Sequence, residues 1–231
     1  MLKKIYYKIN HFAESMVYYG YRFLSIKSIP LWALAAFYKL DKAASSGFHN
    51  YISIYESYFS KIKKNVNALV EIGIGVTESG QMAHMTDYGY RTGNSLRCWR
   101  DYFPNAQIIG IDIYQVDIHE ERITTYIGDQ TREHSMKNIF ESLDKKIDII
   151  IDDGTHEYID QINNFIWLHT YLNKKGLYII EDVDHEIVSK FISLEGISAG
   201  LKIEIEKTYN LKIVKENTKK YNCMVIFEKI N

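Results

Sequence analysis

The stretch Ile147–Tyr158, "IDIIIDDGTHEY", begins as an apolar run and ends in two aspartates, a glycine, a threonine and a histidine. A short run of isoleucines without regular polar alternation is typical of a strand that is buried on both faces. A second run of this kind, "GLYIIEDV" (Gly176–Val183), lies further along the chain. A helical pattern separates the two runs, so they predict neighbouring strands of a parallel sheet with helices on both faces, an α/β fold.

The alternation of strand-like and helical patterns begins near residue 65 and continues to the end of the chain. The predicted helices are "SLRCWRDYF", capped by Asn94 or Ser95, then "REHSMKNIFESL", and a long one, "HEYIDQINNFIWLHTYL". The tail segments "LKIEIEK" and "NCMVIFEKI" predict a hairpin-like antiparallel pair that closes the sheet edge. The remaining predicted strands are "ALVEIG", "QIIGIDI" and a weaker "RITTYIG".

The first 64 residues differ from the rest, because they show helical spacing and aromatic clusters but no strand-like alternation. Tyr51, Tyr55 and Phe59 recur at steps of four and predict one helix face. No Gly-, Ser- or Pro-rich stretch separates the two regions. We expect a helical N-terminal extension over residues 1–64 and a sheet domain over residues 65–231.

Composition excludes several classes of protein. The chain has 28 Lys and Arg against 29 Asp and Glu, so no overall field recruits nucleic acid. No segment approaches the roughly 20 apolar residues of a transmembrane helix. The chain starts with a basic and aromatic segment, "MLKKIYYKINHF". This segment could lie on a membrane surface, or it could dock as a helix on its own protein or on a second subunit. Two distant cysteines, Cys98 and Cys223, fit a reducing compartment and predict a cytoplasmic protein.

The turn "EIGIG" (Glu71–Gly75) follows the first predicted strand of the sheet domain. Glycines there let the backbone approach a ligand closely, although the same pattern also occurs in plain tight turns. Asp112 ends the next strand, where an acid can accept hydrogen bonds from both hydroxyls of a ribose. Ligands of open α/β sheets bind at this edge, and "GDQ" (Gly128–Gln130) falls on it as either a ligand contact or a surface turn.

Four carboxylates follow the two buried runs: Asp152, Asp153, Glu181 and Asp182. Neighbouring strands lie about 4.8 Å apart, so these like charges would repel one another. A divalent cation with hard oxygen ligands, such as Mg²⁺ or Mn²⁺, would relieve that repulsion. We expect Asp153, Glu181 and Asp182 to bind the metal, and Asp152 to cap the following helix or to face the ligand.

His156 comes three residues after Asp153, at the expected first turn of a helix. The positive end of a helix dipole disfavours imidazolium, so the ring would stay neutral and could act as a general base. A lone histidine is more often a surface residue, but the neighbouring carboxylates favour the catalytic interpretation. His185 and His84 are weaker candidates for the same role.

Taken in order, "EIGIG", "SLRCWRDYFPNAQIIGIDIY", "IIIDDGTHEY" and "KKGLYIIEDV" resemble the class I S-adenosylmethionine-dependent methyltransferases. More narrowly, they look like the metal-dependent sugar O-methyltransferases of macrolide antibiotic pathways. "DKAASSGFHNYISIYESYF" (Asp41–Phe59) also resembles the segment that precedes the glycine turn in that family. The resemblance covers Asp41 to about Val183, and "DDGTH", with threonine where serine is common, pairs with "EDV" as its most specific part.

The resemblance implies a Rossmann-like sheet of seven strands, mostly parallel with an antiparallel last strand. It implies Mg²⁺ (or Mn²⁺) and S-adenosylmethionine as cofactors, and transfer of a methyl group to a sugar hydroxyl of a glycan or glycosylated natural product. His156 would be the base, Asp153 would hold the metal with Glu181 and Asp182, and the substrate would be a small molecule or glycan. The expected cofactor contacts are Glu71, Gly73, Gly75, Asp112, Gly128, Asp129 and Asp152.

Other interpretations remain open at this point. The acceptor could be a catechol-like diol, or the protein could be a non-catalytic binding subunit that retains the fold. A hydride-transferring enzyme would need the third glycine of the dinucleotide fingerprint, which "EIGIGVTES" lacks. The long stretch between the glycine turn and residue 93 is expected to cover the substrate, and residues 1–64 to form a lid or the contacts of a homo-oligomer.

Overall fold

The computed structural model describes residues 16–17, 19–20, 29–46, 49–76, 89–215 and 221–230. The basic start of the chain and His84, with most of the loop after the glycine turn, lie outside the described residues. The chain packs as two compact units, one of residues 1–66, 74–108 and 116–124, the other of residues 67–73, 109–115 and 125–231. The division into an extension up to residue 64 and a methyltransferase domain stays a prediction.

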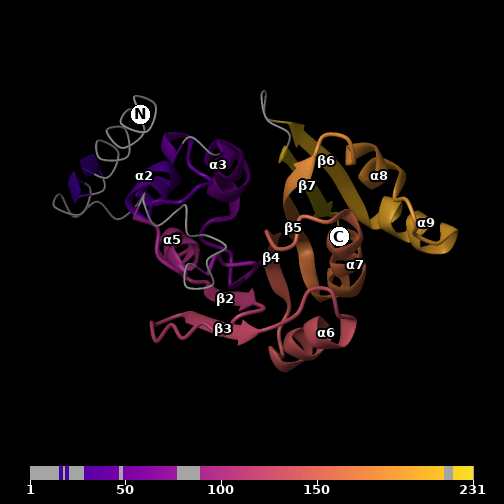
Figure 1. The fold of residues 1–231 in the computed structure, drawn as a ribbon, viewed down its shortest axis with the longest axis horizontal. Coiled ribbons are helices and arrows are strands. Elements are labelled where there is room, and N and C mark those ends of the chain that lie inside the picture. The colour runs from indigo at the N-terminus through magenta and orange to yellow at the C-terminus, as the bar shows by residue number, and fades with distance from the viewer. Residues whose placement is uncertain are drawn as a thin grey trace. The chain divides into compact units, whose positions relative to one another are not determined.

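The described residues of the first unit before residue 66 form helices and the turns between them (Figure 1). Tyr55, Phe59 and Trp99 pack edge to face or tilted, with ring centroids 4.8 to 5.8 Å apart. The predicted apolar face is confirmed, since Tyr51, Tyr55 and Phe59 are all at most 1% exposed. The elements are α2 (Leu31–Phe37), η1 (Ala44–Ser46), α3 (Tyr51–Ile62) and α5 (Asn94–Tyr102).

Helix α5 begins one residue earlier than its sequence suggests. Gly93 occupies the cap position in the left-handed region, with φ of +76°, and no side chain caps the helix. Asn94 lies inside the first turn, where its amide donates to the backbone oxygen of Tyr38 over 2.7 Å. The prediction of Asn94 or Ser95 as the cap is therefore wrong, because a glycine can end the preceding loop with a positive φ and needs no side-chain bond. No described helix is long and apolar enough to cross a membrane.

The described residues form one seven-stranded sheet in the order β3-β2-β1-β4-β5-β7-β6, which confirms the Rossmann-like fold. Strands β1, β4 and β5 are parallel, whereas β7 pairs antiparallel with both β5 and β6. In this register Ile72 lies beside Asp152, and Asp152 beside Ile180. The strands are β1 (Ala68–Ile72), β2 (Gln107–Asp112), β3 (Ile123–Ile127), β4 (Ile147–Asp152), β5 (Leu172–Asp184), β6 (Tyr209–Lys215) and β7 (Tyr221–Lys229).

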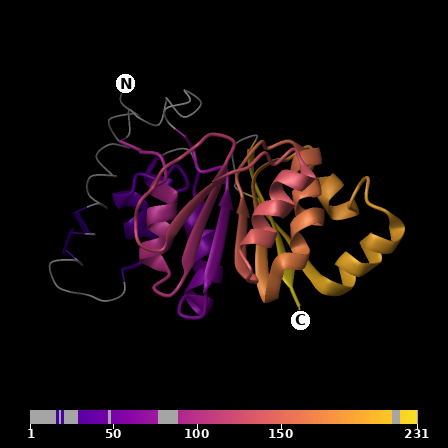
Figure 2. The same cartoon turned by 90° about the horizontal axis from the view of Figure 1, so that it is seen from below.

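The core of the second unit explains why β4 and β5 lack polar alternation. Ile149, Ile150 and Ile151 are completely buried, because both faces of these strands are covered. Helices α6 (Glu133–Ser142) and α7 (Tyr158–Leu168) run side by side in front of the sheet in Figure 2. The Phe165 ring of α7 stacks on Phe227 of β7 at a centroid distance of 3.8 Å.

The tail departs from the sequence prediction. "LKIEIEK" is not a strand but most of helix α9 (Ala199–Thr208), which follows the short helix α8 (Val188–Ser193). Its strict alternation does not mark a buried face, since Ile205 is 3% exposed while Ile203 is 51% exposed. Leu, Lys and Glu are all good helix formers, which outweighs the alternation. The antiparallel pair is present, but β6 begins at Tyr209, after that segment.

Candidate active site at the carboxyl ends of the strands

The turn after β1 is joined on both sides to neighbouring strand ends of its own unit. The backbone N–H of Gly73 donates to Ile111 over 2.8 Å, and that of Asp153 donates to Ile72 over 2.8 Å. Gly73 has φ of +79°, and a Cβ there would lie 2.2 Å from the backbone oxygen of Asp153. Gly73 is therefore required for the close packing of the β1 and β4 turns, whatever ligand approaches it.

Other glycine-turn residues differ in exposure and conformation. Glu71 is 1% exposed. Gly75 also has a positive φ, of +67°, which favours glycine at this position. These local features fit a turn whose backbone, rather than its side chains, is presented at the strand ends.

The ends of β2 and β3 meet through a hydrogen bond of 2.8 Å from the Gly128 N–H to the Asp112 backbone oxygen. Asp112 is half-buried, and its Oδ1 accepts from the N–H of Tyr114 over 3.0 Å. Gly128 is required by packing, since a Cβ there would lie 2.6 Å from the Ile111 side chain. Both residues lie at the strand ends where they were expected.

Asp129 is held by its own turn. Its Oδ1 accepts from the N–H and the hydroxyl of Thr131 over 3.0 and 2.6 Å. Its Oδ2 pairs with Arg132 at 3.1 Å. The hydrogen bond from the Thr131 hydroxyl is the main reason why the pKa of Asp129 lies below its usual value.

At the carboxyl ends of β4 and β5, three side chains that could ligate a metal converge. Asp153, His156 and Asp182 each offer one ligand atom, and these atoms all lie within 4.8 Å of one another. All three residues are half-buried. Two carboxylates and an imidazole this close suit a divalent cation such as Mg²⁺ or Mn²⁺, so the donor set fits the expected metal.

The backbone at this cluster is unusual. His156 has φ of +60° and Asp182 has φ of +53°, in the left-handed region that non-glycine residues rarely adopt. His156 was expected in the first turn of a helix, but α7 begins at Tyr158, because a residue with this φ cannot belong to a right-handed helix. The pairing of β5 with β7 also shifts register between Ile180 and Val183, where Asp182 lies.

Glu181 stands apart from the three converging residues. It is 1% exposed, and its backbone oxygen accepts from the Gln161 amide over 3.1 Å. Glu181 is buried whereas the adjacent Asp182 is half-buried, so the two carboxylates have different surroundings. The Nδ1 atom of His156 is buried and has no hydrogen-bond partner among the described residues.

Asp152 ends β4, immediately before Asp153, and is completely buried. Burial raises its pKa to about 7, although hydrogen bonds from the Tyr178 hydroxyl and the Gly154 N–H oppose this rise. The Tyr178 hydroxyl donates to Oδ2 over 3.2 Å, and the Gln130 amide donates to Oδ1 over 3.3 Å. Sequence reasoning gave Tyr178 no role and placed Gln130 only in the "GDQ" turn, as a ligand contact or a surface residue. It did not reveal the bonds of either residue to Asp152, because these depend on the strand register.

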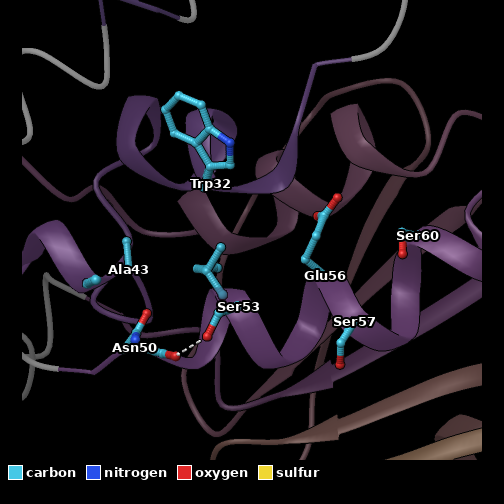
Figure 3. Close-up of a pocket in the computed structure, with 9 residues that line it drawn as sticks. Trp32, Ala43, Asn50, Ser53, Glu56, Ser57 and Ser60 are labelled. Atoms are coloured by element: carbon cyan, nitrogen blue, oxygen red, sulfur yellow. Dashed lines mark hydrogen bonds between the residues drawn. The ribbon is translucent and has the colours of Figure 1, made fainter.

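A cavity lies elsewhere, within the first unit (Figure 3). It has a volume of about 540 Å³, and Trp32 of α2 borders it together with polar side chains of α3 such as Ser53 and Glu56. The Ser53 hydroxyl donates to the Asn50 backbone oxygen over 3.2 Å at one end of the cavity. None of the site residues expected from the sequence lines it.

Comparison with known proteins finds curated relatives that are sugar O-methyltransferases. The chain is 33% identical over 138 residues to the 8-demethyl-8-alpha-L-rhamnosyl tetracenomycin-C 2'-O-methyltransferase of Streptomyces olivaceus, a match that covers 59% of this chain and 34% of the relative. It is 31% identical over 136 residues to the mycinamicin VI 2''-O-methyltransferase of Micromonospora griseorubida, covering 58% of this chain and 32% of the relative. The chain thus matches about a third of the length of these relatives. No protein-family model matches the chain.

Among solved structures, a methyltransferase of the mycinamycin biosynthetic pathway in complex with Mg, SAH and mycinamycin VI superposes with a TM-score of 0.68 at 24% identity. The match covers 88% of this chain and 54% of the other. The resemblance found in the sequence motifs is confirmed: the chain has the fold of the class I S-adenosylmethionine-dependent methyltransferases and is related in sequence to their sugar O-methyltransferases.

Proposed function

We propose that this protein is an S-adenosylmethionine- and Mg²⁺-dependent O-methyltransferase that acts on a sugar hydroxyl. The observation that carries the proposal is the convergence of Asp153, His156 and Asp182 within 4.8 Å at the carboxyl ends of β4 and β5. Ligands of open α/β sheets bind at this edge. The names of the curated relatives support the reaction class, since they are O-methyltransferases of glycosylated compounds.

For the cofactor, we propose a path along the ends of β1, β2 and β3. The backbone of Glu71, Gly73 and Gly75 would lie against the methionine part of S-adenosylmethionine, and Asp112 would accept hydrogen bonds from the ribose. Gly128 and Asp129 would border the adenine. We assign to Asp152 a supporting role, because it is completely buried and bonded to Tyr178 and Gln130.

For the metal, we propose Asp153 and Asp182 as ligands. Glu181 is the third carboxylate that the sequence predicts as a ligand, and that role stays a prediction. When bound there, Mg²⁺ or Mn²⁺ would supply Lewis acidity that lowers the pKa of an acceptor hydroxyl and orients a neighbouring one.

His156 is the proposed general base. Its half-buried ring lies among the carboxylates, where it would accept the proton of the acceptor hydroxyl. Bound S-adenosylmethionine would supply the methyl group, which would pass from its sulfur to the acceptor oxygen, and His156 would hold the proton taken from that oxygen. The protein contributes position and electrostatics to this transfer.

The acceptor we propose is a vicinal diol of a sugar, on a glycosylated natural product or a surface glycan. Two adjacent hydroxyls can reach one metal ion together, which suits a cluster of two carboxylates beside a base. A catechol-like compound offers the same pair of hydroxyls, so it is a competing outcome of an acceptor screen.

The two buried cysteines, Cys98 and Cys223, form no disulfide with each other. We propose that the protein works in the cytoplasm, a reducing compartment. A homo-oligomeric state stays a prediction.

The test combines cofactor binding, chelation and an acceptor screen on the full chain. We expect purified protein to bind S-adenosylmethionine by calorimetry and to methylate one member of a panel of rhamnosides, other glycosides and catechols, detected as a gain of one methyl group by mass spectrometry. EDTA should abolish transfer but leave cofactor binding, and Mg²⁺ or Mn²⁺ should restore it. Transfer that persists in EDTA would reject the metal role, and absence of S-adenosylmethionine binding would favour a non-catalytic subunit.

A further inference from the structure

Gln130 connects the loop after β3 to the turn that carries Asp153 and His156. The residue is 7% exposed although it follows the solvent-facing Asp129 turn. Its side-chain Oε1 accepts from the backbone N–H of Thr155 over 3.0 Å, and its Nε2 donates to Asp152 over 3.3 Å. One side chain thus bonds two residues on either side of Asp153, and it comes from a different part of the sequence.

The contact leaves no free space. A Cβ on Gly154 would lie 1.4 Å from Oε1 of Gln130, so the amide packs directly against the backbone of the turn. Gln130 is itself anchored from the other side, because the Asn164 amide of α7 donates to its backbone oxygen over 2.8 Å. Gln130 is therefore held by α7 through its backbone and by the turn through its side-chain amide.

The turn needs an external support of this kind. His156 has φ of +60°, a strained conformation that persists only where surrounding contacts impose it. Within the turn, the N–H of Glu157 reaches the Thr155 hydroxyl over only a long 3.4 Å contact. The shorter bond to the Thr155 N–H comes from Gln130, immediately before the strained residue.

We propose that Gln130 is a positioning residue for the metal site: its amide holds the Asp152–His156 turn in the strained form that brings Asp153 and His156 towards Asp182. This inference rests on the proposed function for its metal, but not for the conformation of the turn. Hydrogen-bond partners that orient metal ligands commonly change metal affinity by roughly 10- to 100-fold when they are removed.

The decisive variant is Gln130→Met, which nearly keeps the volume and removes both hydrogen bonds. Ser135→Ala is the matched control, because the Ser135 hydroxyl of α6 accepts from the N–H of Asp129, the neighbour of Gln130, over 2.9 Å. Within the described part of the chain, this hydroxyl does not bond to the Asp152–His156 turn. We expect Mn²⁺ affinity, measured from free Mn²⁺ by electron paramagnetic resonance, to fall about 10- to 100-fold in Gln130→Met. It should change less than about twofold in Ser135→Ala, and S-adenosylmethionine affinity should change less than about threefold in both variants.

A second measurement reads the turn without any metal. Amide hydrogen exchange of residues 153–157 in EDTA should accelerate about tenfold or more in Gln130→Met, while exchange in β1 and β5 stays at the wild-type rate. Wild-type Mn²⁺ affinity together with wild-type exchange in this variant would overturn the inference, even if its melting temperature falls, because Gln130 would then serve packing alone.

The two proposals fail in different ways. If the wild-type protein binds no Mn²⁺, the proposed function fails, and exchange at residues 153–157 alone decides the role of Gln130. If the wild-type protein binds Mn²⁺ but Gln130→Met equals Ser135→Ala in both measurements, only the positioning role fails. Should Gln130→Met not fold, Gln130→Glu replaces it. That variant loses the amide donor to Asp152, and it should weaken Mn²⁺ binding by at least about threefold; wild-type affinity there would also overturn the role.

Discussion

The turns after β3 and β4 both place an aspartate just beyond a strand, yet they are stabilised in opposite ways. Asp129, after β3, is held by Thr131 and Arg132 of its own turn. Asp153, after β4, lies in a turn that Gln130 braces, and it faces Asp182 from another strand. An acid at a strand end is therefore a better functional candidate when the groups around it come from distant segments than when its own turn engages it.

Replacing the aspartate of each turn with asparagine should give the largest difference between the two turns. Asp153→Asn removes the charge of a proposed metal ligand, so we expect Mn²⁺ affinity to fall by more than about 100-fold. This is more than the loss of a hydrogen bond that only orients a ligand would cause. Asp129→Asn keeps an oxygen that can accept from Thr131 and loses only an exposed pair with Arg132, so Mn²⁺ affinity should change less than about twofold. Equal Mn²⁺ titrations of the two variants would contradict the distinction between the turns.

A second prediction separates the roles of His156 as base and as ligand. If the ring is the base, His156→Ala should lower kcat by roughly 10²–10⁴-fold, whereas Mn²⁺ affinity should remain within about tenfold of the wild type. His134→Ala, an exposed position in α6, is the control and should leave both unchanged. A parallel loss of Mn²⁺ affinity and kcat, with kcat restored at high Mn²⁺ concentration, would identify His156 as a ligand.

Two glycines give a third test, which concerns stability. Gly73→Ala should lower the free energy of unfolding by about 2–4 kcal/mol, because φ is +79° and a Cβ would meet the Asp153 backbone at 2.2 Å. Gly200→Ala, in α9 with no atom within 4 Å of its Cβ position, should raise stability by roughly 0.5 kcal/mol through helix propensity. Chemical denaturation measures both, and a neutral Gly73→Ala would show that the β1 and β4 turns can separate.

The smallest expected effect is a pH dependence far from the cluster. Burial lowers the pKa of His169, which is 6% exposed and whose Nδ1 lies 3.3 Å from the Tyr209 hydroxyl. The folded state therefore binds fewer protons than the unfolded state below the ordinary pKa of histidine, about 6.5. The contribution of neutral His169 to the free energy of unfolding is therefore fully present above that pH. It is lost as the pH falls through the pKa of His169 in the folded state. His169→Gln should flatten this acid-side slope in denaturation series from pH 7.5 to 5; an unchanged slope would assign it to other groups.

Much of the fold was predictable because it depends on local patterns. The isoleucine runs of β4 and β5 and the four-residue steps of Tyr51, Tyr55 and Phe59 express burial directly in the sequence. The error at "LKIEIEK" arose because alternation resembles a strand even where only Ile205 is buried. Pattern and helix propensity disagreed there, and propensity prevailed in a mostly exposed segment.

The site was predictable only in part. Strand ends and acid pairs pointed to Asp153 and Asp182. The sequence could not separate Glu181 from Asp182, because that depends on which face of β5 each side chain occupies at a register shift. It also could not reveal Gln130 or Tyr178, whose bonds to Asp152 bridge 22 and 26 residues of sequence. Contacts of this kind depend on the order of the strands in the sheet, and a short stretch of sequence does not reveal that order.

The positive φ angles at His156 and Asp182 restrict which residues can replace them. Asn and Asp enter the left-handed region more readily than most residues, and His does so more often than average, whereas β-branched residues are true outliers there. Replacing Asp182 with Glu would keep the charge yet change both reach and backbone preference. Placing the three side chains on a regular strand and helix would therefore not reproduce their arrangement, because that arrangement depends on the left-handed backbone. To transfer the cluster to another protein, the two left-handed backbone positions must be transferred together with the side chains they carry.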